Sequence, residues 1–202
     1  MVRGDLSNSL VHLTRSTSIQ NAADSFQSIF NSGILRGSNV GIRGGHSCVC
    51  FSETPLSTLT QALAEPLDEK GMRYEPFGVI VGKTWLFERG GRPAIYQPEE
   101  EYGLLNEAQQ YRHVRYEPNR GKNKDFTWER EWRIQVEELP LDLDHVTFVV
   151  PTRKWEKRFQ DKHTTQVATT SFIVGIPVAR PMPWHFVVLE DLGFSGFEEY
   201  DL

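Results

Sequence analysis

The alternation of aromatic and charged residues from Thr127 to Val136 predicts a β-strand. Successive side chains of a strand point to opposite faces. One predicted face holds Trp128, Arg130, Trp132 and Ile134, and the other holds Glu129, Glu131, Arg133 and Gln135. Carboxylates gain little from a pleated surface, so these two glutamates are the first candidates for a functional site.

Apolar spacing predicts further elements on both sides of this strand. Expected strands cover 10–15, 48–52, 74–82, 92–97 and 145–150, and apolar runs follow at 172–178 and 184–189. Expected helices cover 19–32, a stretch after Pro55, one turn at 85–87, 99–114 and a short basic segment around 152–162.

Local signals refine this pattern. The hydroxyls of Ser16 to Ser18 are expected to cap the first helix, and Gly33 is suited to end it. The strand at 92–97 is expected to pair with the strand at 74–82 after a turn at Gly90 and Gly91. Short strands interleaved with a few helices predict one α+β domain over residues 1–202.

Composition narrows the function classes. The formal net charge of -5 argues against a generally basic nucleic-acid binder, although it does not exclude a local basic groove. The two cysteines, Cys48 and Cys50, lie one residue apart. They provide neither a disulfide framework nor a four-ligand zinc site, so no metal is expected.

The chain shows no membrane or export signal. No apolar run approaches the roughly 20 residues that span a bilayer. The N-terminal segment Met1–Asn8 also lacks the apolar core of a signal peptide. We therefore expect a protein of the reducing cytoplasm that does not associate with membranes.

Weaker candidate residues each have a structural alternative. His12 and Thr14 share one predicted strand face and suit hydrogen bonds to a ribose or an amide, but a core histidine bonded to a carbonyl is the alternative. Ser52 ends a strand and suits a ligand contact, but Ser52 or Thr54 equally suits a helix cap. Cys48 and Cys50 are interpreted as buried small residues.

A glycine-rich basic segment, Gly41–His46, suits close approach to a pyrophosphate. It matches neither the dinucleotide fingerprint nor the P-loop, and a surface loop is the alternative. Of the two carboxylates Glu129 and Glu131, one could bind a sugar hydroxyl while the other activates an acceptor. The alternative for them is ion pairing with Arg133 or a cross-strand neighbour.

Three separated residues carry a resemblance to a known fold. His12 lies on the first predicted strand, Ser52 ends a middle strand, and Glu131 comes late in the chain. This order resembles the ADP-ribosyltransferase fold, whose signature is a His or Arg, then a Ser, Thr or Tyr, then a glutamate. The resemblance implies a single ADP-ribosyltransferase-like domain with a split, mostly antiparallel sheet around an NAD cleft.

Two branches of bacterial proteins share further segments. The first strand and a helix ending in Ser32–Leu35 resemble the opening of DarT-like enzymes, which act on nucleic acid. AbiGi-type phage-defence proteins are similar in four segments: Cys50–Leu56, Phe77–Ile80, Pro93–Tyr96 and Glu129–Arg133. The motifs lie within residues 10–135, and the C-terminal third is expected to complete the sheet.

Two departures leave the acceptor open among DNA, RNA, protein and water. DarT-like enzymes use an arginine between the first helix and the middle strand to hold NAD or assist catalysis. Arg43 and Arg36 are rival candidates for this arginine. The Glu129-x-Glu131 spacing also resembles arginine-modifying toxins, whose first-strand residue is Arg rather than His.

The resemblance implies a role for each candidate. Cleavage of the nicotinamide–ribose bond passes through a positively charged sugar, as in glycoside hydrolysis. Glu131, bonded to the ribose 2′-hydroxyl and supported by Ser52, would stabilise that charge. Glu129 and the basic loop Arg115–Lys124 would face the acceptor. The remaining NAD contacts would come from His12, Thr14 and Arg43.

The expected function is thus an NAD-dependent mono-ADP-ribosyltransferase, with NAD as its substrate. It would act as a toxin or effector on nucleic acid or protein, in anti-phage defence or a toxin–antitoxin system, with an antitoxin or defence-complex protein as partner. Two alternatives are an NAD glycohydrolase and a non-catalytic binding module in which Glu129 and Glu131 are paired.

Overall fold

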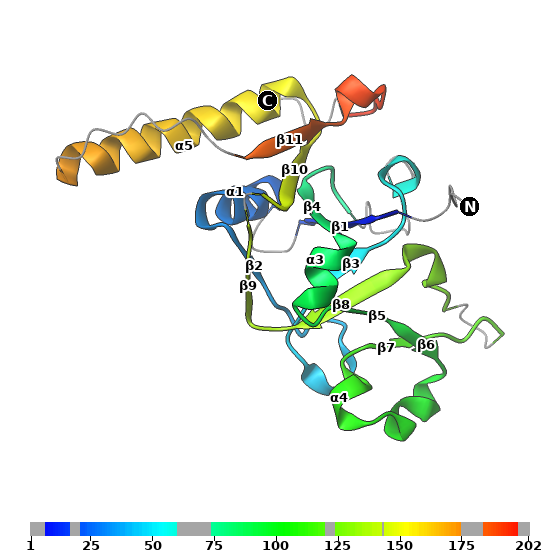
Figure 1. The fold of residues 1–202 in the computed structure, drawn as a ribbon. Coiled ribbons are helices and arrows are strands. Elements are labelled where there is room, and N and C mark those ends of the chain that lie inside the picture. The colour runs from blue at the N-terminus through cyan, green and yellow to red at the C-terminus, as the bar shows by residue number, and fades with distance from the viewer. Residues whose placement is uncertain are drawn as a thin grey trace. The chain divides into compact units, whose positions relative to one another are not determined.

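The computed structural model describes residues 7–16, 21–59, 74–119, 124–142, 144–174 and 184–197. It is a mixed α+β structure with a large, mostly antiparallel sheet and few helices, which confirms the predicted class. The chain divides into two compact units, each made of separate segments (Figure 1). The first unit comprises 1–12, 34–59 and 80–141, and the second comprises 13–33, 60–79 and 142–202.

Five neighbouring strands of the main sheet, most of whose residues belong to the first unit, carry the residues that the sequence singled out. Their order is β4 (Gly78–Gly82), β1 (Ser9–Leu13), β3 (Cys48–Ser52), β8 (Glu131–Gln135) and β5 (Arg92–Pro93). β3 runs antiparallel to both β1 and β8, and β5 runs antiparallel to β8. Two small pairs add β2 (Ile34–Arg36) with β9 (Glu138–Pro140), and β6 (Ile95–Gln97) with β7 (His113–Arg115).

Short helical segments connect these strands. The α-helices are α3 (Lys83–Glu88) and α4 (Glu107–Gln110), and a helical turn also starts at Leu56, directly after Pro55. The 3-10 turns are η1 (Arg43–Gly45), η2 (Glu99–Leu104) and η3 (Thr127–Glu129). Alternate residues of β3 and β8 form the core of this unit: Val49, Phe51, Trp132 and Ile134.

The second unit has an aromatic core. It contains α1 (Ala22–Ser32), β10 (Val146–Val150), α5 (Arg153–Val174), β11 (His185–Val188) and the turn η4 (Glu190–Leu192). β10 and β11 are parallel, and α5 is the long helix in Figure 1. Phe26 is fully buried and contacts four phenylalanine rings: Phe30, Phe77, Phe148 and Phe159.

Both ends of α1 are set by local residues. Asn21 is the N-cap, and its side chain accepts a 2.8 Å hydrogen bond from the Asp24 N–H. The Ser16 hydroxyl also bonds the start of the helix, because it accepts from the Ala22 N–H at 3.1 Å. The other predicted caps, Thr17 and Ser18, lie outside the described residues. Gly33 ends the helix with φ 64°, as predicted.

Two expected elements between residues 92 and 114 are wrong. The segment 92–97 forms two strands, β5 and β6, because the chain changes its pairing partner after Ala94. The Ala94 N–H bonds the Glu131 carbonyl of β8 at 2.7 Å, whereas the Ile95 N–H bonds the Arg112 carbonyl next to β7 at 2.8 Å. β5 pairs with β8 rather than with β4. The segment 99–114 is not one helix, because Asn106 caps a new short turn and the chain then enters β7.

The strand predicted from Thr127 to Val136 begins only at Glu131. Thr127–Glu129 forms the turn η3, and Arg130 adopts a left-handed backbone with φ 46°. This break removes the regular alternation from the first half of the segment. As a result, the prediction that Glu129 and Glu131 share one strand face is wrong.

The C-terminal predictions are met in part. The strand at 145–150 is β10, the run at 184–189 contains β11, and the short basic helix is the much longer α5. Residues 175–178 of the run at 172–178 lie outside the described residues. Within the described ranges, no helix is both long and apolar enough to cross a membrane.

Candidate functional site

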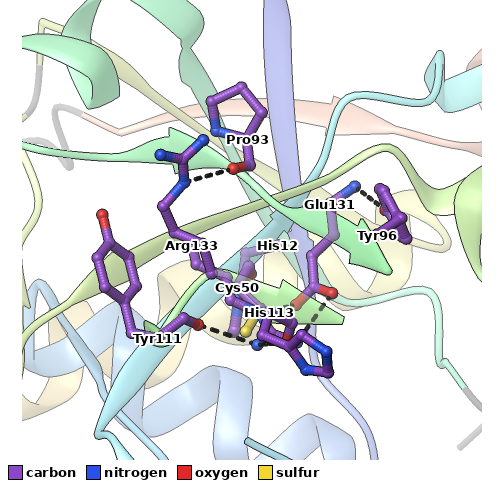
Figure 2. Close-up of polar contacts among 9 residues, drawn as sticks. His12, Cys50, Pro93, Tyr96, Tyr111, His113, Glu131 and Arg133 are labelled. Carbon is purple, nitrogen blue, oxygen red and sulfur yellow. Dashed lines mark hydrogen bonds and ion pairs between the residues drawn. The ribbon is translucent and has the colours of Figure 1, made fainter. Parts of the chain in front are cut away.

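Ser52 and Glu131 lie directly opposite each other on the paired strands β3 and β8. Directly opposed residues of an antiparallel pair project from the same face. Cys50 and Arg133, two residues further along each strand, are also opposed and therefore share that face. The result is a group of a hydroxyl, a carboxylate, a thiol and a guanidinium on one face. Figure 2 shows its Glu131, Cys50 and Arg133 side chains.

The Glu131 carboxylate is held by Arg133 through two parallel hydrogen bonds. Arg133 Nε donates to Glu131 Oε1 at 2.8 Å, and Arg133 Nη2 donates to Oε2 at 3.1 Å. The side chain of Glu131 is only 12% exposed, and that of Arg133 only 6%. Such a bidentate pair fixes both the position and the orientation of the carboxylate.

Arg133 is itself anchored from the other side. Its Nη1 donates to the carbonyl oxygens of Tyr111 at 3.0 Å and His113 at 2.8 Å. Burial lowers the pKa of Arg133, but hydrogen bonding and the charge of Glu131 outweigh burial, so the net shift is upward. The guanidinium is therefore a permanent, rigid charge beneath Glu131.

The thiol of Cys50 lies on the same face as this carboxylate. Burial, followed by the charge of Glu131 and by hydrogen bonding to its side chain, raises the pKa of Cys50 far above the ordinary range for a thiol. Burial likewise raises the pKa of Cys48 to about 11. Because a thiolate is the reactive form, neither cysteine is poised as a nucleophile at neutral pH.

Tyr96 secures the backbone at the start of β8. Its hydroxyl oxygen accepts a 2.8 Å hydrogen bond from the Glu131 N–H. Burial is the largest cause that raises the pKa of Tyr96, to about 12. Glu131 is thus fixed through its backbone by Tyr96 and through its side chain by Arg133.

His12 reaches β3 through the backbone of Cys50. Its Nδ1 lies 2.8 Å from the Cys50 carbonyl oxygen. A carbonyl only accepts, so Nδ1 carries a proton and donates it. The ring packs against Phe51 with 5.7 Å between centroids, and Phe51 alternates with Cys50 and Ser52 along β3. His12 therefore adjoins the strand of Ser52 without sharing its face.

The hydroxyl of Ser52 is bonded to the chain that precedes Glu131. It donates to the Glu129 carbonyl at 2.6 Å and accepts from the Thr54 N–H at 3.1 Å. The Thr54 hydroxyl similarly donates to the Trp128 carbonyl at 2.5 Å. Ser52 therefore holds the backbone of η3 two residues before Glu131, and the support for the Glu131 carboxylate that the resemblance implies stays a prediction.

Glu53 forms a separate polar contact beside this group. Its Oε1 accepts from Lys83 Nζ at 2.6 Å, and its Oε2 accepts from Trp132 Nε1 at 2.8 Å. The Glu53 N–H donates to the Arg130 carbonyl at 3.2 Å. One carboxylate therefore ties α3 and β8 to the end of β3.

Glu129 is placed differently from Glu131. It lies on η3 and is 6% exposed. The left-handed Arg130 separates the two glutamates, so they do not form a pair on one strand. Of the acceptor-facing basic loop predicted beside Glu129, residues 120–123 lie outside the described part of the chain, and Arg115 is ion-paired with the buried Glu117 at 2.5 Å.

The two rival arginines lie on different elements and both have carboxylate partners. Arg43, on η1, bonds Glu99 at 2.7 Å and lies over the ring of Tyr102 at 5.1 Å from its centroid. Arg36, on β2, is 65% exposed and lies 3.5 Å from Glu138. The structure brings neither into contact with Glu131.

Thr14 lies outside β1 and in the second unit. It is buried, and its hydroxyl lies 3.0 Å from the Phe77 carbonyl and 3.2 Å from the Ala22 carbonyl. The prediction that Thr14 shares a strand face with His12 is therefore wrong. Its hydroxyl serves the fold of the second unit.

Cys50, Arg133 and Tyr96 are the residues of this group that sequence reasoning left without a functional role. The single useful signal was the spacing of Glu131 and Arg133 within one strand. Nothing in the sequence around Cys50 or Tyr96 indicates that either residue lies beside Glu131. Among the residues that the structure describes, no group of three metal-ligating side chains gathers at one point.

Comparisons with known proteins give no match to any family model, curated protein or solved structure. The function must therefore be argued from the residues themselves.

Proposed function

We propose that the chain is an NAD-dependent ADP-ribosyltransferase that transfers ADP-ribose to nucleic acid or protein. The supporting observation is the arrangement of the three motif residues on neighbouring strands. Glu131 lies opposite Ser52, Ser52 lies opposite Val11, and His12 follows Val11 on β1. Residues separated by 119 positions in the sequence thus come onto the neighbouring strands β1, β3 and β8, with Ser52 and Glu131 on one face of the sheet and His12 on the other.

Glu131 is the proposed catalytic carboxylate. In the reaction, the bond between ribose C1′ and the nicotinamide nitrogen breaks, a bond from C1′ to an acceptor oxygen or nitrogen forms, and the acceptor loses a proton. A fixed carboxylate stabilises the positive charge that develops on the sugar. Arg133 and Tyr96 supply that fixation, since they hold the Glu131 side chain and backbone.

Two other proposed contacts require local movement. Arg43 must leave Glu99 before it meets a pyrophosphate. Glu129 must move with η3 before it meets an acceptor, because it is buried. Thr14 has no part in this proposal.

The test is incubation with labelled NAD together with DNA, RNA and lysate protein, followed by mass spectrometry of each acceptor. Wild type is expected to add one ADP-ribosyl group, and Glu131→Gln is expected to lose the transfer. Glu138→Gln is the matched control, since Glu138 is an exposed carboxylate on β9 of the same unit. Equal transfer by wild type and Glu131→Gln would exclude Glu131 as the catalytic residue.

A folding measurement accompanies this comparison, because Glu131→Gln weakens a buried ion pair. Ser52→Ala serves as a second variant that leaves this ion pair in place. Release of nicotinamide without any acceptor adduct would instead indicate an NAD glycohydrolase.

The ion pair itself favours a second candidate, a non-catalytic binding module of a defence complex. Both carboxylate oxygens of Glu131 are bonded to Arg133 in this structure, as expected of a structural pair. Absence of NAD binding and turnover in a stably folded protein, with tight association to a partner protein, would support this candidate.

A further inference from the structure

A cluster of arginines surrounds the turn between α3 and β5. Arg89 and Arg92 flank the glycine pair of this turn. Arg112 comes directly before β7 and contacts β5, where its Nε donates to the Pro93 carbonyl at 2.9 Å. Tyr111 contacts the same turn, because its hydroxyl donates to the Gly90 carbonyl at 3.5 Å. Burial raises the pKa of Tyr111, and the charges of Arg112 and Arg92 act in the opposite direction.

These arginines differ in their partners from four other arginines of the first unit. Arg36, Arg43, Arg115 and Arg133 each contact a carboxylate. Among the residues that the structure describes, no ion pair joins Arg89, Arg92 or Arg112 to a carboxylate, although Glu88 is exposed at the end of α3. Within the described part of the chain, whose full sequence has a net charge of -5, these three guanidiniums are therefore available to an external anion.

Two of the three guanidiniums are held against aromatic rings. Arg92 lies 4.0 Å from the ring centroid of Phe87, and Arg89 lies 4.1 Å from that of Trp85. Arg92 Nη1 also donates to the carbonyls of Phe87 and Gly91, both at 2.7 Å. An arginine held by stacking and by carbonyls loses less freedom on meeting an anion.

The glycine pair explains how the turn brings these groups together. Gly90 has φ 99°, a backbone that L side chains rarely adopt. At Gly91, a β-carbon would lie 2.5 Å from Leu86 Cγ, so the turn packs directly on α3. Phe87 is nevertheless 49% exposed as a residue, although Arg92 lies over its ring.

We propose that Phe87, Arg89, Arg92 and Arg112 form a docking surface for single-stranded nucleic acid. Guanidinium groups bind phosphate oxygens, and an exposed aromatic ring offers a face on which a base stacks. Bases of a single strand are accessible for such stacking, whereas those of a duplex are already stacked. An anionic membrane or an acidic protein would use the charges but would gain less from an exposed planar ring.

The surface is tested with a fluorescent mixed-sequence single strand of about 16 nucleotides and without NAD. Wild type is expected to bind it more tightly than the matching duplex, with affinity falling as salt rises. The double variant Arg92→Gln/Arg112→Gln is expected to bind at least about tenfold more weakly and to reduce the salt slope by about 2. Phe87→Ala is expected to weaken binding about tenfold with an unchanged salt slope.

Matched controls are available in the same unit. Arg36→Gln removes an exposed arginine elsewhere, and Leu104→Ala removes an apolar side chain that is 82% exposed. Both are expected to bind like wild type. Should the glutamine variants unfold, Arg92→Lys/Arg112→Lys keeps the charges and is expected to keep the salt slope.

Several outcomes would overturn this surface: no binding by wild type, binding of the duplex at least as tightly, or equal losses in Arg36→Gln. Preferential binding of vesicles containing phosphatidylserine, or of a polyglutamate peptide, would also overturn it. The surface does not depend on the proposed transferase activity, because binding is measured without NAD. A stable Glu131→Gln variant is expected to bind the single strand like wild type even if it transfers no ADP-ribose.

Discussion

Arg133 binds the carboxylate of Glu131, two positions away on the same strand, through two hydrogen bonds with N–O distances of 2.8 and 3.1 Å. Residues two apart on a strand share a face, and the opposed Cys50 closes the group from β3. The carboxylate is consequently oriented before any ligand arrives.

This relationship makes Arg133 critical for stability. Arg133→Gln leaves a buried carboxylate without its cation and removes the bidentate contact, so we expect a loss of about 3–5 kcal/mol in the free energy of unfolding. Urea denaturation measures it. The control Arg36→Gln, which breaks an exposed pair with Glu138, is expected to cost less than about 1 kcal/mol. Similar small losses for both variants would contradict the structural role of Arg133.

Alkaline pH is expected to destabilise the fold through its buried thiols and tyrosine. The pKa of Cys48 rises from 9.0 to about 11 on folding, and that of Tyr96 from 10.0 to about 12. A raised pKa means that the unfolded chain loses these protons first. Their contribution to stability is therefore complete below pH 9.0 and is lost progressively as pH rises through about 11 and 12.

Urea denaturation at neutral pH and near pH 11 measures this loss, and Cys48→Ala is expected to reduce it. The same burial predicts slow reaction of both cysteines with a thiol reagent in the native protein and fast reaction after unfolding. Rapid modification under native conditions would contradict the buried, protonated state of Cys50.

The aromatic core of the second unit is expected to be sensitive to truncation. Phe26→Ala removes a fully buried ring in contact with four others, so we expect a loss of about 3–5 kcal/mol. Leu192→Ala is the control in the same unit, because Leu192 is 57% exposed. Thermal unfolding followed by circular dichroism compares the two variants, and equal midpoints would contradict this core.

Arg130 is expected to tolerate glycine and to reject β-branched residues. Its left-handed backbone costs an ordinary residue about 1 kcal/mol or more, a cost that glycine lacks. Arg130→Gly is thus expected to match or exceed the stability of wild type, and Arg130→Val is expected to fall below it. Urea denaturation measures the stability of both variants. An Arg130→Val variant that is more stable than Arg130→Gly would contradict this prediction.

Sequence patterns predicted the elements whose signals are local. The strand Cys48–Ser52 is an uninterrupted β-prone run, and Gly33 supplies the left-handed residue that ends α1. The alternation around Glu131 also predicted correctly that Glu131 and Arg133 share a face. The break at Arg130 was not predictable, because no residue type there signals a left-handed backbone.

Long-range contacts were the second source of error. β5 pairs with β8 instead of the nearer β4, since the choice depends on the Ala94–Glu131 backbone bond and not on the alternation of either segment. The thiol contact of Cys50 with Glu131 likewise depends on strand register. Register follows from the whole packed sheet, so a single strand does not specify it.

Glu53 serves two donors at once, Lys83 on α3 and Trp132 on β8. An apolar residue at position 53 would leave both the ammonium and the indole N–H without their acceptor. Substitution at any one of these three positions therefore favours compensating substitutions at the other two. We expect positions 53, 83 and 132 to covary during the divergence of related chains, which offers an evolutionary readout of how β3, α3 and β8 are joined.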